Sequence, residues 1–324
     1  MRIQACVLGV AAAAATASSS PALAQTAYPT QLVKMVVALP AGGFADAVAR
    51  VVAEPLGPVL GQSIVIENRA GAGGNIGARA VAQAAPDGYT VLVTTTAIAI
   101  NDKLYASKGY ATADLVPVAI VGSAPEVIVV HPANPARTLA QLIKPADGKP
   151  VQFGTAGVGT GSHIVGEYLF KILSKVPAEH VAFSGGAPAI QNTLGNHVNS
   201  MVGTLPAMAE HIRSGAMRGL AVASAKRETT IPDVPTLAEA GYPDFQASSW
   251  VGFFVPLSTN SAIVQRLNQS INHVLDLAAT RQRLETSGLE IMINDPAQTA
   301  RFFESEVGRW GTRVQALGLA IHSP

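Results

Sequence analysis

The sequence predicts an α/β fold in which a mostly parallel sheet carries helices on both faces. Strand-like and helix-like apolar patterns alternate along most of the chain, which is typical of such sheets. Several strand-like runs are apolar throughout and rich in β-branched residues, as expected for strands covered on both faces. Most of these runs lead into a helix through a loop rich in glycine, serine and threonine.

The first third of the chain contains three predicted strands and two predicted helices. The strands are expected at 32–39, 63–68 and 89–94, and the helices at 44–61 and 75–85. Asp46 lies where an acidic side chain stabilises a helix start. Pro55 and Pro58 should shorten or kink the first helix.

The same alternation returns in the middle of the chain. Strands are expected at 151–155, 179–183, 198–204 and 217–224, with helical segments at 163–173 and 205–215 and the segment 184–194 between strands. From about Ser261 the chain should be mainly helical, at 261–278 and 297–317, with a short strand-like piece at 289–294. We find no long linker, so short strands must join the domains, and 123–130 and 219–224 are the candidate hinges.

Residues 1–24 have the pattern of a secretory signal peptide. Arg2 supplies the early positive charge, and residues 5–15 are apolar. Ala22-Leu23-Ala24 is a small-x-small cleavage motif, which predicts cleavage before Gln25. The alternative, a folded first helix, fits this pattern poorly. No later run approaches the roughly 18 apolar residues of a membrane span. The only cysteine, Cys6, lies in the removed segment, so the mature chain should contain no disulfide.

The charge balance argues against nucleic acid as a partner. The chain has 22 basic and 21 acidic residues, and without Arg2 the mature chain is neutral. It contains no run of lysine and arginine that could follow a phosphate backbone. Aromatic residues make up only 5% of the chain, which points away from sugar and quaternary-amine ligands.

No pattern of an enzyme or of a metal site is present. Neither Ser162 nor Ser184 has the glycine that a nucleophile elbow needs two residues earlier, and no HExxH occurs. His163 is the only histidine expected near a cleft, where a packing role is the main alternative to ligand contact. We therefore expect no catalytic residue, no metal and no cofactor.

The glycine-rich stretch ENRAGAGGNIGARA, 67–80, resembles a phosphate-binding loop only superficially. A dinucleotide fingerprint needs a third glycine where Ile76 stands, and Gly77 comes one residue late. No lysine follows the glycines as in a P-loop. We expect a turn after the second strand, and whether it contacts ligand stays open.

Three other loops suit a small anion. They are PAGGFAD at 40–46, TTTA at 94–97 and TAGVGTGS at 155–162. Unpaired N–H groups at helix starts and in glycine-rich turns bind carboxylates without a full positive charge. Each loop alone could be an ordinary turn, but together, after parallel strands, they indicate a binding cleft.

Across nearly the whole mature chain these motifs resemble the extracytoplasmic solute receptors of tripartite tricarboxylate transporters, often called Bug proteins. The resemblance runs from YPTQLVKMVVALPAGGFADAVAR through IENRAGAGGNIGARAVAQAAPDGYTVLV and GTAGVGTGSH to LAVASAKRETTIPDVPTLAEAGYPDF, SSWVGFF and EVGRWG. It implies a two-lobe periplasmic-binding-protein fold of type II, a location in the periplasm and closure of the lobes around a small carboxylate or dicarboxylate. The expected lobes are 25–124 with 223–324, and 125–222.

The resemblance also implies ligand-binding residues in both lobes. They are Gly42, Gly43, Phe44, Asp46, Thr95 and Thr96 in the first lobe, and Thr155, Gly159, Thr160, Ser162, Ser184 and Gly185 in the second. The chain departs from the family pattern at Val158, Phe183 and Gly203, among other positions. These departures favour a more apolar pocket for an aromatic or longer-chain acid, and the missing acid at Gly203 argues against amino acids.

The expected partner is a set of membrane transporter subunits, and the receptor itself should be a monomer without membrane insertion. Two alternatives remain. One is a sensory adaptor whose closed form docks on a membrane sensor kinase, because a protein with two states can be recognised by any partner. The other is an exported hydrolase or lyase on the same scaffold.

Overall fold

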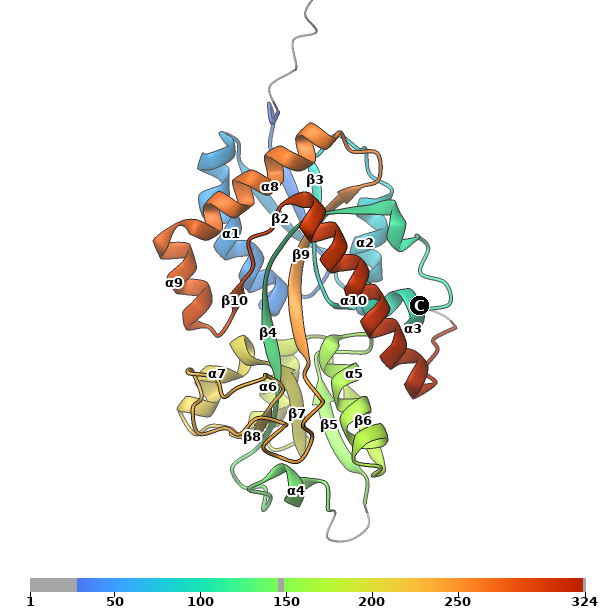
Figure 1. The fold of residues 1–324 in the computed structure, drawn as a ribbon, viewed down its shortest axis with the longest axis vertical. Coiled ribbons are helices and arrows are strands. Elements are labelled where there is room, and N and C mark those ends of the chain that lie inside the picture. The colour runs from blue at the N-terminus through green and yellow to red at the C-terminus, as the bar shows by residue number, and fades with distance from the viewer. Residues whose placement is uncertain (1–27, 145–148, 323–324) are drawn as a thin grey trace, which may run out of the picture.

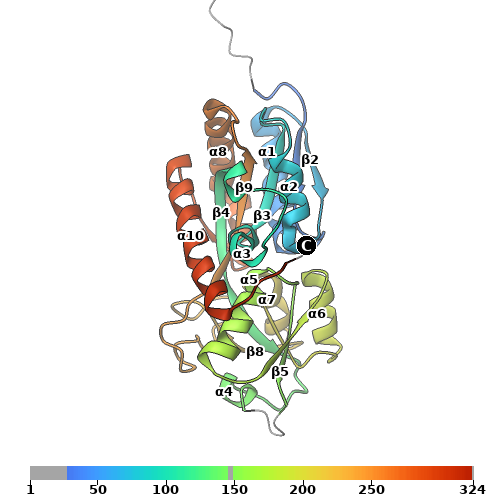
Figure 2. The same cartoon turned by 90° about the vertical axis from the view of Figure 1, so that its right-hand side faces the viewer.

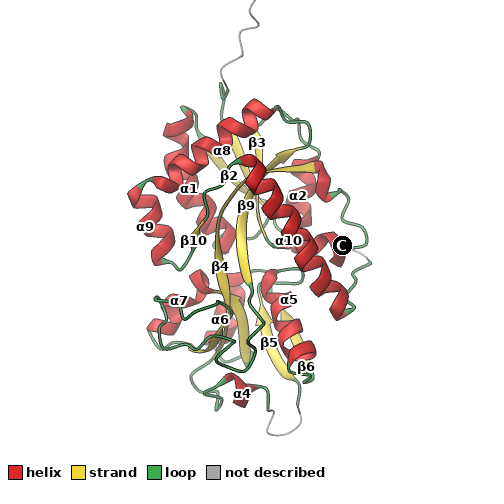
Figure 3. Ribbon diagram, in the orientation of Figure 1, coloured by secondary structure: helices red, strands yellow, loops and turns green. Residues whose placement is uncertain are grey.

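The computed structural model describes residues 28–144 and 149–322, so the predicted signal peptide lies outside the described residues. The predicted α/β class is confirmed: helices surround a curled, mixed sheet (Figure 1, Figure 3). The strand order is β2-β1-β3-β9-β4-β7-β5-β6, and β8 and β10 also pair with β4. None of the described helices is long and apolar enough to cross a membrane.

The strands are mostly short, with one long exception. Their bounds are β1 Val33–Val37, β2 Ile64–Asn68, β3 Thr90–Thr95, β4 Leu115–Val130, β5 Val151–Thr155, β6 Ala178–Ala182, β7 Ser200–Thr204, β8 Arg218–Val222, β9 Ser248–Pro256 and β10 Glu290–Ile291. The longest, β4, has 16 residues and passes through the middle of the molecule (Figure 1).

The helices follow the strands much as the alternation predicts. Their bounds are α1 Phe44–Leu60, α2 Asn75–Ala82, α3 Ala97–Leu104, α4 Leu139–Leu142, α5 Gly161–Glu167, α6 Gly186–Leu194, α7 Leu205–Arg213, α8 Ser261–Asp276, α9 Ala278–Thr286 and α10 Pro296–Leu317. A π-helical segment, Tyr168–Leu173, continues α5, and short 3-10 turns span Ala72–Gly74 and Thr112–Asp114.

Burial on both faces explains the continuous apolar runs of the parallel strands. In β1, which pairs in parallel with β2 and β3, Met35 and Val37 pack on the side of α1 and α8, whereas Val36 packs with the opposite core. A parallel strand with helices on both sides has no face left for polar residues.

The central strands are antiparallel, which the sequence analysis did not anticipate. Between Leu115 and Pro125, β4 pairs with β9, and from Glu126 onward it pairs with β7. Neither the first half of β4 nor β9 was predicted as a strand. Pro117 and Pro125 interrupt the pattern of β4, and proline is a signal against a central strand.

These central strands divide the molecule into an upper part, with β1–β3, α1–α3 and α8–α10, and a lower part, with β5–β8 and α4–α7 (Figure 1). Residues 223–247, between β8 and β9, run beside the lower part. There the Leu237 N–H donates to the Val222 carbonyl, and the Ala247 N–H donates to the Ala223 carbonyl. The division into lobes at 124/125 and 222/223 stays a prediction.

Apolar packing differs between the two sides of the sheet. On the side of α3, α5 and α10, one core continues from the upper part into the lower part and includes Ile98, Ile164 and Trp310 (Figure 2). On the other side the upper core under α1 and α8 is separate from the lower core under α6 and α7. A continuous core thus joins the two parts on one side, whereas on the other side they meet only at local contacts such as Gly288 with Leu205 and Pro40 with Gly185.

Candidate functional site

A cavity of about 220 Å³ lies between the upper and lower parts, where the two separate cores face each other. The upper part and β9 contribute Leu39, Pro40, Gly42, Gly43, Phe44, Thr95 and Ser249. The lower part contributes Ala156, Thr160, Gly161, Ser162, Gly185, Gly186, Ala187, Ile190, Met201, Val202, Gly203, Thr204, Ala207 and Met208. None of these lining residues has a charged side chain. The volume is below the roughly 300–1,000 Å³ of typical ligand pockets, which favours a small ligand.

Four helices begin at the cavity wall, of which α5 is capped by the Thr160 side chain and three have no such cap. The residues before the first turns of these three are Gly43 for α1, Gly185 for α6 and Thr204 for α7, and none of them caps its helix with a side-chain hydrogen bond. The first N–H groups of a helix lack partners inside the helix, and the helix dipole adds positive potential there. The cavity therefore offers donors to an anion without offering a cation.

Asp46 holds the upper loop, residues 40–43, in place from the side away from the cavity. Its carboxylate accepts hydrogen bonds from the Gly42 N–H over 2.8 Å, from Arg50 over 2.9 Å and from Asn68 over 3.0 Å. Burial by itself raises the pKa of Asp46, but the hydrogen bonds from Arg50, Gly42 and Asn68 outweigh it and bring the pKa below its usual value. Gly42 has φ of 75°, a conformation that favours glycine.

Hydroxyl groups hold the lower loop, 155–160, in its conformation. Thr160 caps α5 by accepting from the His163 N–H over 3.3 Å, and its hydroxyl donates to the Gly157 carbonyl over 2.7 Å. The Thr155 hydroxyl accepts from the Gly157 N–H over 3.2 Å. The small polar residues of this loop thus satisfy its own backbone.

Two histidines stack behind the lower loop. The ring centroids of His163 and His180 are 4.1 Å apart, and His180 Nε2 lies 2.7 Å from Thr155 Oγ1. Burial, together with the neighbouring His180, lowers the pKa of His163 to about 3, and burial lowers the pKa of His180 to about 4. Both rings are therefore neutral near pH 7.

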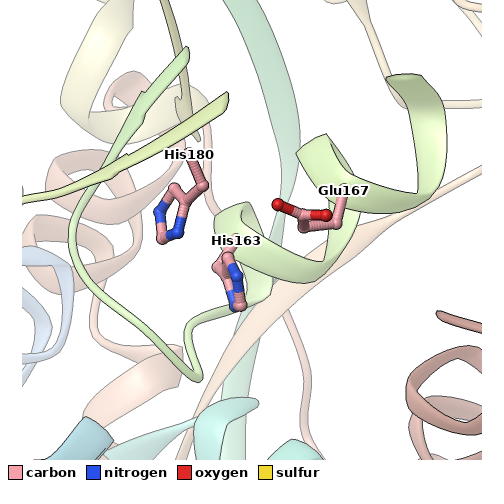
Figure 4. A group of neighbouring side chains, drawn as sticks. All are labelled: His163, Glu167 and His180. Atoms are coloured by element: carbon pink, nitrogen blue, oxygen red, sulfur yellow. The ribbon is translucent and has the colours of Figure 1, made fainter. Parts of the chain in front are cut away.

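Glu167, one helical turn after His163, completes a group with metal-ligand character (Figure 4). One potential ligand atom of each of the three residues lies within 4.8 Å of the others, and histidine with carboxylate suits zinc. However, Glu167 forms an ion pair with Lys171 over 2.5 Å, and His180 is engaged by Thr155. The group thus supports the lower loop through protein contacts. The sequence analysis did not anticipate this group, because His163 and Glu167 lie on α5 whereas His180 lies on β6.

Glu126 is the residue near the cavity that the sequence analysis missed entirely. Its side chain is fully buried, and it accepts a hydrogen bond from Ser249 over 2.6 Å and one from Ser162 over 2.9 Å. Both serines line the cavity. None of the ion pairs in the described part of the chain includes Glu126, and burial raises its pKa to about 7.

The structure brings many of the predicted site residues to the cavity. Those that line it are Gly42, Gly43, Phe44, Thr95, Thr160, Ser162 and Gly185. The remaining five, Asp46, Thr96, Thr155, Gly159 and Ser184, do not line it. Thr96 accepts from the Trp250 N–H over 2.9 Å and so fixes β9 to the start of α3. Gly159 faces Asn101 and Tyr105, and Ser184 is exposed.

Several lining residues were not predicted as ligand contacts. The end of β7 and the start of α7, from Met201 to Met208, form much of the lower wall. A strand followed directly by a helix start was a signal that could have identified Thr204. Nothing in the local sequence around Ser249 marks it, because only the pairing of β9 with β4 brings it to the cavity.

Two sequence features lie away from the cavity. The glycine-rich turn after β2 packs against the lower loop, where a Cβ at Gly73 would lie 2.9 Å from the Val158 carbonyl. Of the three residues that motivated the hypothesis of an apolar pocket, Val158 and Phe183 do not line the cavity, whereas Gly203 does. The wall is apolar because of other residues, among them Phe44, Ile190 and Met208.

Comparisons with known proteins agree with this architecture. The sequence profile of one family, described as "Tripartite tricarboxylate transporter family receptor", matches residues 48–319. Protein BugT of Bordetella pertussis is 38% identical over 312 residues, covering 95% of each chain. A protein of Pseudomonas sp. strain P51, described by its position between tcbD and tcbE, is 34% identical over 308 residues, covering 94% of this chain and 91% of that protein.

Solved structures share the fold over almost their full length. The periplasmic binding protein BugD is 32% identical with a TM-score of 0.85, covering 91% of this chain and 100% of that one. MatC from Rhodopseudomonas palustris, solved with bound malate, is 31% identical with a TM-score of 0.83, covering 89% and 100%. A second R. palustris protein, solved with adipate, is 33% identical with a TM-score of 0.86, covering 91% and 100%.

Proposed function

Because this chain belongs to the family of tripartite tricarboxylate transporter receptors, we propose that it captures a small carboxylate or dicarboxylate in the periplasm and delivers it to a transporter of that type. The family consists of periplasmic solute-binding receptors and not of enzymes. Ligand capture and transfer, rather than turnover, is therefore the activity to test.

The observation that carries the proposal is the set of three helix starts at a cavity without charged side chains. A carboxylate would satisfy their free N–H groups and gain from the helix dipoles. Malate and adipate, which accompany two of the similar structures, are both dicarboxylates. Their presence in similar proteins supports the same ligand class for this chain.

We assign ligand contact to the predicted residues that line the cavity, above all the N–H groups of Phe44 and Gly185 and the hydroxyl of Thr95. The Gly43 N–H and the Thr160 hydroxyl are weaker donors to a ligand, because they already donate to the carbonyls of Pro40 and Gly157. For Asp46, Thr96 and Thr155, hydrogen bonds to the loops and to β9 support a positioning role. Contact of Gly159 and Ser184 with ligand stays a prediction.

The packing pattern supports closure of the two parts around the ligand. The continuous core on the side of α10 would act as the hinge, whereas the two separate cores could approach each other across the cavity. A ligand that contacts both parts favours the closed state by its extra contacts there.

A thermal-shift screen of residues 25–324 tests the proposal. The compounds are aliphatic mono-, di- and tricarboxylates, aromatic acids and amino acids. We expect dicarboxylates of four to eight carbons to raise the melting temperature, because a ligand that binds only the folded protein stabilises it. X-ray scattering with the best compound should show a smaller radius of gyration for a monomer. Stabilisation by none of the carboxylates would refute the proposal.

Delivery to a transporter is tested separately in cells. A strain that lacks only this protein should lose high-affinity uptake of the compound found in the screen. Unchanged uptake combined with loss of a transcriptional response to that compound would instead identify a sensory adaptor.

A further inference from the structure

Glu126 lies directly behind the cavity wall. The Ser162 and Ser249 hydroxyls, which line the cavity, both point their protons at the Glu126 carboxylate. While Glu126 is ionised, both serines can therefore present only oxygen lone pairs to the cavity. A bound carboxylate at this wall would find acceptors instead of donors, and a negative charge close behind them.

Among the described residues, no cation forms an ion pair with Glu126. Glu126 is the only ionisable residue of β4, and the neighbouring strands β7 and β9 contain none. The other two strands that pair with β4 contain Glu290, opposite Ser123, and Arg218, opposite Val130. The Arg218 guanidinium donates to the carbonyls of Pro132, Asn134 and Ala136.

Four helices, α5, α7, α8 and α10, pack against β4. The ionisable residues of α5 and α7 are His163, Glu167, Glu210, His211 and Arg213, and those of α8 and α10 are Arg266, His273, Asp276, Arg301, Glu304, Glu306, Arg309 and Arg313. Arg309 pairs with Glu306, and Arg313 lies over the Trp310 ring. His163 faces His180, Glu167 pairs with Lys171, and Glu210 pairs with Arg213.

Burial without a counter-ion favours the neutral form of a carboxyl group, and a nearby negative charge favours it further. The burial of Glu126 already raises its pKa to about 7. A carboxylate ligand in the cavity would raise this pKa again. A neutral Glu126 carries one proton of its own and can donate it to one serine, so the hydroxyl of that serine becomes free to donate to the ligand.

We propose that the cavity binds a carboxylate together with one proton, and that Glu126 is the residue that takes up the proton. This inference rests on the proposed function, because it takes the ligand to be a carboxylate. It makes Ser162 and Ser249 switchable: they accept hydrogen bonds from the cavity side when Glu126 is ionised, and one of them donates to the ligand when Glu126 is neutral.

The direction of the pH dependence follows from this coupling. Binding favours the protonated form, so affinity is highest below pH 7 and falls as the pH rises above it. If only the protonated form binds, the Kd increases by up to about tenfold per pH unit. Aliphatic dicarboxylates lose their second proton between about pH 5 and 6, so the protons are counted at pH 7.5, where the ligand is fully ionised.

Isothermal titration calorimetry tests the inference on residues 25–324. The probe is the aliphatic dicarboxylate of four to eight carbons with the largest thermal shift. Titrations between pH 6 and 8.5 give the Kd, and titrations at pH 7.5 in buffers of different ionisation enthalpy count the protons. We expect the wild type to take up about three quarters of a proton at pH 7.5, because about a quarter of Glu126 is already protonated there when its pKa is about 7. We also expect it to bind at least tenfold more weakly at pH 8.5 than at pH 6.

The variant Glu126→Gln mimics the neutral carboxyl group. We expect its Kd to be the same from pH 6 to 8.5 and its proton uptake to be zero. Glu306→Gln is the matched control, because Glu306 is also buried but bonds Trp250, Trp310 and Arg309 away from the cavity. This control should keep the proton uptake of the wild type.

The possible results separate a failure of the role of Glu126 from a failure of the proposed function. Tight dicarboxylate binding by the wild type with no proton uptake would overturn the role of Glu126 and leave the proposed function intact. Binding that strengthens with pH would also overturn it, because the ionised form of Glu126 would then be the form that binds. If no carboxylate binds at any pH, both the inference and the proposed function fail. A ¹³C NMR titration of the wild type without ligand gives an independent check, since one carboxyl signal should titrate near pH 7 and be absent in Glu126→Gln.

Discussion

The hydroxyl of Ser249 donates a 2.6 Å hydrogen bond to Glu126 across 123 residues of sequence. This contact joins β9 to β4 where both strands pass between the upper and lower parts. A buried carboxyl group at this position has consequences for stability as well as for binding.

We predict that Glu126→Gln stabilises the protein at pH 8 but not at pH 4.5. The pKa of Glu126 is about 7 in the folded state and 4.5 ordinarily. Protonated Glu126 therefore contributes its full share to the free energy of unfolding below pH 4.5, and this contribution is lost as the pH rises through 7. The difference at pH 8 should be on the order of 3 kcal/mol in favour of glutamine. Urea unfolding at both pH values measures it, and equal destabilisation at both would contradict the assigned pKa direction.

A negative charge in the cavity should abolish carboxylate binding. Ala207 lines the cavity in the first turn of α7, so Ala207→Asp would oppose an anion there. We expect the Kd for the best dicarboxylate to rise by more than about a hundredfold, since like charges a few ångströms apart repel by several kcal/mol in a partly buried site. Gln191→Asp, an exposed position on α6, adds the same charge and should leave the Kd within about twofold. Calorimetry at pH 6.5 compares the two variants.

Asp46→Asn should weaken binding through the upper loop. The variant loses the ion pair with Arg50 and cannot accept from both Gly42 and Asn68. If the loop conformation that binds the ligand is destabilised by about 1 kcal/mol, binding becomes roughly fivefold weaker. Glu54→Gln is the control, because Glu54 forms an exposed ion pair with Arg283. Wild-type affinity in Asp46→Asn would show that the loop keeps its conformation without the carboxylate.

The pair of neutral histidines should make the protein less stable in acid. The pKa of His180 is lowered to about 4 in the folded state, whereas the unfolded chain binds a proton near pH 6.5. Stability is therefore lost as the pH falls from 6.5 towards 4. Over this pH range we expect the free energy of unfolding of His180→Asn to fall less than that of the wild type, by on the order of 2 kcal/mol because the ring is partly exposed. The exposed His273→Asn is the control, and identical pH profiles of wild type and His180→Asn would contradict the prediction.

Local patterns in the sequence were enough for much of the fold. The strands around Met35, Leu92 and Phe153 and the helices after the first and third of them were predicted because apolar periodicity and glycine-rich turns act over a few residues. The helix after the strand of Leu92 was not predicted. The same local signals identified the loops of Gly43, Thr95 and Thr160 that reach the cavity, whereas Gly185 was predicted only from the family resemblance. The antiparallel centre was missed, because the pairing of β4 and β9 depends on contacts between segments more than a hundred residues apart.

By itself, the sequence determined the class of the fold, the family and the kind of loop that binds an anion, since these depend on neighbouring residues and on motifs in a fixed order. Only the tertiary structure decided which of those loops meet and what lies behind them. The order β9-β4-β7 brings Ser249 and Thr204 to either side of Glu126, and α5 adds Ser162. Segments that are distant in the sequence bury Glu126, and no local sequence pattern predicts this burial. Because burial raises the pKa of its carboxyl group, Glu126 becomes a proton acceptor near neutral pH.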